Sequence, residues 1–95
     1  MTHQALVRSE PIVSARSSEH DRFDTLTRRE RDVFEKLITG ASNKEVGRRL
    51  GISPRTIEIH RARILKKLDI KSVADMLRMA MRLGIEKRIE ESIED

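Results

Sequence analysis

The sequence predicts an all-α fold of four helices behind a flexible N-terminal arm. Apolar residues recur at spacings of three and four, which is typical of amphipathic helices. The connections between the periodic stretches are short and contain glycine, as expected between packed helices. Each stretch also begins just after a serine or threonine that can cap a helix: Thr27, Ser42, Ser53 and Ser72.

The arm comprises residues 1–24. It mixes polar and charged side chains, contains Pro11 and shows no sustained apolar period. The first helix is expected to begin at Thr27, because Glu30 three residues later completes a capping box. Its buried face is predicted to be Val33, Phe34, Leu37 and Ile38, ahead of the glycine that ends it.

A second capping box, Ser42 with Glu45, predicts a helix of about two turns that ends at Gly51. The third helix should span residues 54–68, because Ser53 can cap it and Pro54 suits the first helical position. The tight turn between these two helices is that of a helix-turn-helix.

The fourth helix is expected over residues 73–83, with Val73, Leu77 and Ala80 as its core seam on a helical wheel. A second apolar stripe on this helix favours a partner surface, although extra core against the arm is the alternative. The tail, residues 86–95, carries five acids and two bases and could form another helical turn or two. The stripe assigned to dimerisation consists of Met76, Met79 and Leu83.

The charge is unevenly distributed along the chain. Residues 43–67 contain eight Lys or Arg and two Glu, a balance of +6 within a protein of net charge +4. Such a block is typical of a surface that binds a polyanion, usually nucleic acid. A solvated helix surface explains the charge alone equally well.

Several separated motifs together resemble the LuxR/GerE-type DNA-binding domain of bacterial regulators. They are LTRRE at residues 26–30, GASNKE at 40–45, TIEIH at 56–60 and ILKKL at 64–68. The resemblance covers residues 26–85, within a domain that we set at 25–85. It implies that the helix at 54–68 enters the major groove of double-stranded DNA. It also implies that the helix at 73–83 pairs two copies into a homodimer.

On a helical wheel, Ile57, Ile64 and Leu68 form the core seam of the third helix, and Ile59 lies opposite. A single exposed isoleucine is ordinary, but on a DNA-facing surface it can contact a thymine methyl. Glu58 could accept a hydrogen bond from cytosine, or it could orient Arg55 or Arg61 through a local ion pair. The predicted DNA-binding residues are Asn43, Lys44, Arg55, Thr56, Glu58, Ile59, Ala62, Arg63 and Lys66.

These patterns predict a sequence-specific, dimeric transcription regulator that needs no cofactor. A sigma-factor helix-turn-helix is a close alternative. An adaptor or antagonist that binds another regulator through residues 73–83 and the tail is a different one. Another regulator or RNA polymerase would be a further partner. No catalytic constellation appears, the chain has no cysteine, and His3, His20 and His60 are too scattered to suggest a metal site.

The cytoplasm is the expected compartment, because the first ten residues, MTHQALVRSE, lack the pattern of a signal peptide. No membrane span is expected, because charged residues interrupt every apolar run. About 25 residues precede the motifs. Full-length response regulators with this domain carry a receiver or ligand-sensing domain there. The leading Met1 favours a stand-alone regulator, with a piece of a longer chain as the alternative.

Overall fold

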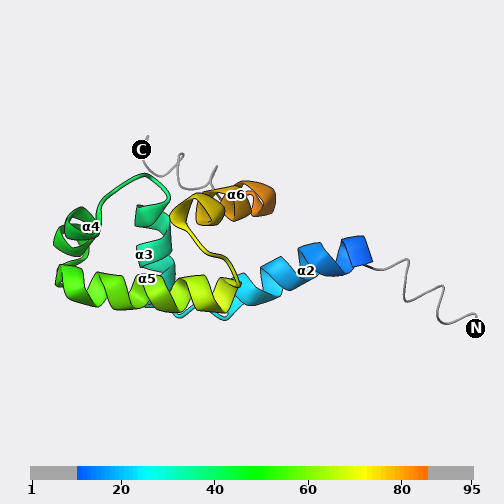
Figure 1. Ribbon diagram of the computed structural model, residues 1–95, viewed down its shortest axis with the longest axis horizontal. Coiled ribbons are helices and arrows are strands. Elements are labelled where there is room, and N and C mark those ends of the chain that lie inside the picture. Colours follow the sequence, from blue (N-terminus) through cyan, green and yellow to red (C-terminus); the bar gives the residue numbers. More distant parts are fainter. Residues whose placement is uncertain (1–10, 86–95) are drawn as a thin grey trace, which may run out of the picture.

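The computed structural model describes the backbone of residues 11–85 and the side chains of residues 18–85. All of the regular secondary structure in this part of the chain is helical, with no strand, so the predicted all-α class is confirmed (Figure 1). The four predicted helices are all present, and one more precedes them. They are α2 (Pro11–Asp24), α3 (Arg28–Leu37), α4 (Asn43–Leu50), α5 (Pro54–Leu68) and α6 (Val73–Leu83).

The predicted caps set the start of each of the last four helices. The side chains of Thr27, Ser42, Ser53 and Ser72 each accept a hydrogen bond from the backbone N–H three residues later. Only at Thr27 is the capping box reciprocal, because the Glu30 carboxylate also accepts from the Thr27 N–H at 2.9 Å. Glu45 instead lies within ion-pair distance of Arg48 and Arg49, so the second box is half formed.

Helix α5 is the longest of the last four helices and forms the base on which α3 and α4 pack (Figure 1). Helix α4 lies against the amino-terminal half of α5, and α3 crosses α5. Helix α6 makes its main backbone contacts with α2 rather than with α5. The N-terminal helix therefore supports α6 directly.

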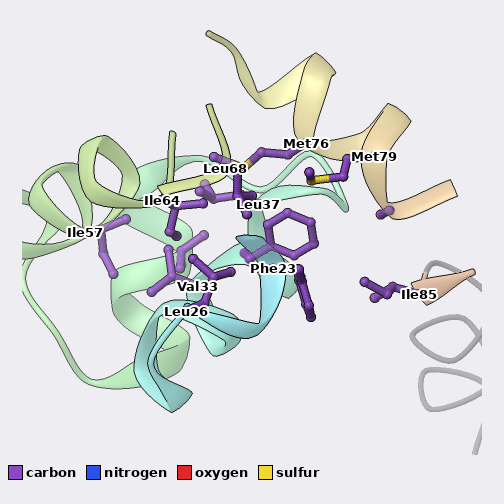
Figure 2. Close-up of a cluster of buried hydrophobic side chains, with 13 residues drawn as sticks. Phe23, Leu26, Val33, Leu37, Ile57, Ile64, Leu68, Met76, Met79 and Ile85 are labelled. Carbon is purple, nitrogen blue, oxygen red and sulfur yellow. The ribbon is translucent and has the colours of Figure 1, made fainter. Parts of the chain in front are cut away.

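The core joins residues from every helix. Val33, Phe34, Ile57, Ile64 and Leu68 are fully buried. Figure 2 shows the cluster continuing past Leu37 and Phe23 to the α6 methionines.

Helix α2 alters the predicted boundary between arm and domain. Residues 11–24 are helical, and the Phe23 ring packs edge-on against the Phe34 ring with 5.3 Å between centroids. An aromatic pair of this kind adds roughly 1 kcal/mol to the burial itself. The last turns of α2 thus belong to the folded domain. Residues 1–10 of the arm and the 86–95 tail lie outside the described residues.

The predicted core seam of α6 is right at Val73 and Ala80, which pack in or against the core, but wrong at Leu77. Met76, Met79 and Ala80 are fully buried, whereas Leu77 is half-buried and is not packed against the core cluster. Met76 and Met79 therefore cannot form the dimer contact assigned to them, because α2 and the core already cover them. Leu83 also packs against the core, although it keeps some exposure. The outward apolar side chains are Leu77 and Met81, the latter 56% exposed.

A buried carboxylate ties the start of α3 to the end of α5. Glu30 is 3% exposed, and its Oε1 accepts a hydrogen bond from Lys67 Nζ at 2.7 Å. Burial raises the pKa of Glu30, but the hydrogen bonds from Lys67 and from the Thr27 backbone outweigh it and hold the pKa below its ordinary value of 4.5. Lys67 Nζ also donates to the Thr25 carbonyl at 3.3 Å.

Glu30→Gln should lower the free energy of unfolding at pH 7 by about 1 to 2 kcal/mol, because the charged hydrogen bonds are lost. A lowered folded-state pKa contributes stability above the unfolded-state pKa, and this contribution disappears as the pH falls through the folded-state value. Urea titrations from pH 7 to pH 3 should therefore show the two proteins converging in stability at acid pH. A constant difference across that range would contradict the charged role of Glu30. The exposed Glu58→Gln serves as control and should change stability by less than about 0.5 kcal/mol.

Candidate nucleic-acid interface

The turn between α4 and α5 is built around Gly47. A Cβ atom at this position would overlap the Ile52 carbonyl oxygen and would lie 3.4 Å from Pro54 N. Gly51 takes the left-handed conformation, with φ 71°, and the Ile52 N–H donates to the Gly47 carbonyl at 2.8 Å. The close approach of the two backbones fixes the angle at which α5 leaves α4.

Helix α5 separates a buried face from an exposed one, as the wheel predicts. Ile57, Ile64 and Leu68 are fully buried, whereas Ile59 is 40% exposed. Most of the predicted contact residues on α5 share the outward side, and only Thr56, at its start, is half-buried. The exposed members are Arg55, Glu58, Ile59, Ala62, Arg63 and Lys66.

Arg55 and Glu58 form an ion pair on this face. Arg55 Nη1 lies 3.4 Å from Glu58 Oε1, and the two side chains are 79% and 54% exposed. An exposed pair of this kind contributes little to folding stability. Its effect is to hold the guanidinium near the amino end of α5 and to offset the carboxylate's charge. Of the two roles predicted for Glu58, this geometry favours orientation of Arg55.

The start of α4 contributes a second part of the same basic surface. Lys44 is exposed, and Asn43 is half-buried, with an Oδ1 atom that is enclosed and meets no hydrogen-bond donor among the described residues. The first N–H groups of a helix attract anions because they lack intrahelical acceptors. Within residues 18–85, neither Lys44 nor Arg63 nor Lys66 has an acidic group within 4.0 Å, the limit for an ion pair.

This helix-turn-helix matches the family of bacterial regulatory proteins called luxR over residues 24–80. The chain belongs to the luxR family. Among curated luxR-family relatives, the transcriptional regulatory protein FixJ of Bradyrhizobium diazoefficiens is 40% identical over 88 residues, which are 90% of this chain and 43% of that protein. The transcriptional regulatory protein UhpA of Escherichia coli is 44% identical over 57 residues, covering 60% of this chain and 29% of UhpA. The chain thus spans less than half the length of these relatives.

Two solved structures are similar to this chain over most of its length. Full-length FixJ from B. japonicum superposes with a TM-score of 0.66 at 40% identity, over 86% of this chain and 42% of that one. The response regulator StyR gives a TM-score of 0.73 at 28% identity, over 83% of this chain and 40% of that one.

The described residues contain neither a cluster that could hold a metal ion nor a membrane-spanning helix. No group of three or more His, Asp or Glu side chains lies where it could hold a metal ion within that part of the chain. None of the described helices combines the length and apolarity needed to cross a membrane.

Several contacts of the domain were not predicted from the sequence. Arg22 and Glu19 on α2 bond to residues 46 and 63 positions away, and no local spacing signals such pairs. Gly47 does leave a signal, because a glycine inside a helical pattern usually marks a close approach of backbones.

Proposed function

We propose that the protein is a sequence-specific transcription regulator that binds double-stranded DNA as a homodimer, with α5 in the major groove. The observation that supports this most is the exposed face of α5. It places an apolar Ile59 and a small Ala62 between basic residues, within a helix-turn-helix of a regulatory family. Short and apolar side chains allow close approach to base edges, and the bases at either end suit phosphates.

The proposed contacts divide by chemistry. Lys44, Arg63 and Lys66 bind phosphates, assisted by the N–H groups at the start of α4 near Asn43. Arg55, Thr56 and Glu58 lie near the amino end of α5, the part of a recognition helix that most often reaches bases. Ile59 and Ala62 form the apolar centre. The phosphate contacts would supply most of the affinity through charge, and the base contacts would supply the sequence preference.

The homodimer is proposed to form through the outward apolar face of α6. Ala74, Leu77 and Met81 follow one another at helical spacing and carry the exposure that Met76 and Met79 lack. The area is small, so the contact is weak in solution and is completed when two copies occupy neighbouring half-sites. Leu83 lies on the opposite side of α6, where it packs against the core, so it is not part of this face.

Ile59→Ala should weaken binding to a selected DNA site by roughly 1 kcal/mol and leave nonspecific binding nearly unchanged, because an apolar base contact carries no charge. The melting temperature should stay close to that of the wild type, since the side chain lies outside the core. Fluorescence anisotropy with the selected duplex and a scrambled duplex measures both affinities.

The control uses the same duplex with each thymine replaced in turn by uracil, which lacks the methyl group. At one position the uracil site should weaken the wild type but not the Ile59→Ala variant. If the wild type binds the uracil and thymine duplexes equally tightly at every position, Ile59 does not contact a thymine methyl group. If the Ile59→Ala variant melts at a much lower temperature than the wild type, Ile59 is instead part of the core.

A second candidate is an adaptor or antagonist that binds another regulator through the same outward face of α6. The exposure of Leu77 and Met81 favours it as much as it favours a homodimer. A mobility shift with genomic DNA fragments separates the two, because an antagonist should shift none of them. Either role, and any contact with RNA polymerase, places the protein in the cytoplasm, the compartment we propose.

A further inference from the structure

Helix α2 reaches the far end of the recognition helix. Arg22 Nε donates a hydrogen bond to the Leu68 carbonyl oxygen at 3.2 Å, and Leu68 is the last residue of α5. Carbonyl groups in the last turn of a helix lack intrahelical donors, and a cation there is favoured by the helix dipole. Arg22 therefore anchors α2 to the carboxyl end of α5.

The same helix holds the end of α6. Arg82 Nε lies 3.1 Å from both Glu19 carboxylate oxygens, and Arg82 Nη2 lies 2.5 Å from Oε2. The Glu19 side chain is only 18% exposed. The hydrogen bond from Arg82 holds the pKa of Glu19 below its ordinary value, and the same hydrogen bond raises the pKa of Arg82. A bidentate pair between an arginine and a carboxylate fixes the relative orientation of the two side chains as well as their separation.

These two attachments lie one helical turn apart on α2 and span the junction of α5 and α6. The intervening residues, Asp69 to Ser72, form a short connection in which Asp69 takes a left-handed conformation with φ 57°. Since α6 makes its main backbone contacts with α2, the angle between α6 and α5 depends on α2. Figure 2 shows Met79 projecting from α6 into the core on the side of Phe23.

That angle matters for a dimer on DNA. The outward face of α6 meets its copy, and α5 enters the groove, so their relative direction sets the spacing of two recognition helices. A change of angle would leave one domain able to bind one half-site. It would prevent two domains from binding neighbouring half-sites together.

We propose that α2 is a brace between α5 and α6, and that cooperative DNA binding depends on its docked position. The inference rests on the proposed DNA-binding function. The coupling is reciprocal, so DNA with two half-sites also stabilises the docked position of α2.

Glu19→Gln tests the brace, with Asp24→Asn as the matched control. Both variants remove one negative charge from α2, but Asp24 is 70% exposed and pairs with Arg31 of α3 rather than with α5 or α6. Charge alone predicts slightly tighter DNA binding by both. The brace predicts that Glu19→Gln weakens binding to the selected two-half-site duplex by roughly fivefold, while Asp24→Asn does not. Binding to a duplex with one half-site scrambled should not weaken in either variant.

The charge-swapped double variant Glu19→Arg/Arg82→Glu re-forms the pair and should recover cooperative binding. Circular dichroism at the assay temperature confirms that each variant is folded. Unchanged cooperativity in Glu19→Gln, equal losses on both duplexes, or no recovery in the swapped variant would each overturn the brace. A wild type that binds neither duplex would overturn the proposed function itself, which distinguishes the two failures.

Discussion

Met79→Asp is expected to abolish stable folding of the domain. The Met79 side chain is fully buried among the core residues that join α6 to α2. A carboxylate at this position would have no partner in an apolar environment, so we expect a loss of about 4 kcal/mol or more. Native proteins have about 5 to 15 kcal/mol of net stability, and a domain this small lies near the lower end, so a loss of this size leaves little or no net stability. Far-ultraviolet circular dichroism should show much lower helical content at 25 °C and no cooperative melting.

Met81→Asp provides the comparison, because it introduces the same charge two residues away at a side chain that is 56% exposed. This variant should melt within a few degrees of the wild type but should lose cooperative binding to a two-half-site duplex. If Met79→Asp folds normally, the packing of α6 on α2 is wrong. If Met81→Asp retains cooperative binding, the outward face of α6 is not the dimer contact.

Gly47→Ala is expected to destabilise the domain by about 3 kcal/mol, because the added methyl group overlaps the backbone of the turn before α5. Intrinsic helix propensity predicts the opposite sign, since alanine is favoured over glycine in a helix by about 1 kcal/mol. Urea denaturation of the two proteins therefore decides between steric overlap and propensity. DNA affinity should also fall, because α5 must shift relative to the start of α4.

Arg48→Ala is the matched control for Gly47→Ala. Arg48 is the next residue on α4, exposed and only loosely paired with Glu45 at 3.8 Å. Its substitution should change stability by no more than about 0.5 kcal/mol. Equal or greater stability of Gly47→Ala relative to the wild type would show that the turn has room for a side chain.

Local chemistry made much of this fold predictable. A capping residue such as Thr27 or Ser53 satisfies the backbone beside it, so its signal lies within four residues of its effect. The buried face of α5 was also predictable, because Ile57, Ile64 and Leu68 are separated from its exposed face by charged residues. The outward position of Ile59 follows from that same periodicity.

The parts that could not be predicted depend on distant partners. Apolar side chains surround most of α6, so a wheel cannot tell Met79 from Leu77 until the position of α2 is known. Among the described side chains of α2, Phe23 alone is strongly buried, and the helix has no amphipathic period from which its packing could be predicted. The charge of the basic surface on α4 and α5 was visible in the sequence. The Arg55–Glu58 pairing was only one of two alternatives there, and the structure shows it.

Selection of bound duplexes from a random-sequence library, using the full chain at physiological salt, tests the central claim most directly. The selected sequences should contain two related half-sites with two-fold symmetry, about 10 base pairs apart from centre to centre. Affinity for them should fall steeply with salt, because Lys44, Arg63 and Lys66 displace counterions from phosphates. Enrichment of no sequence, with binding equally weak for all duplexes, would contradict a sequence-specific DNA-binding function.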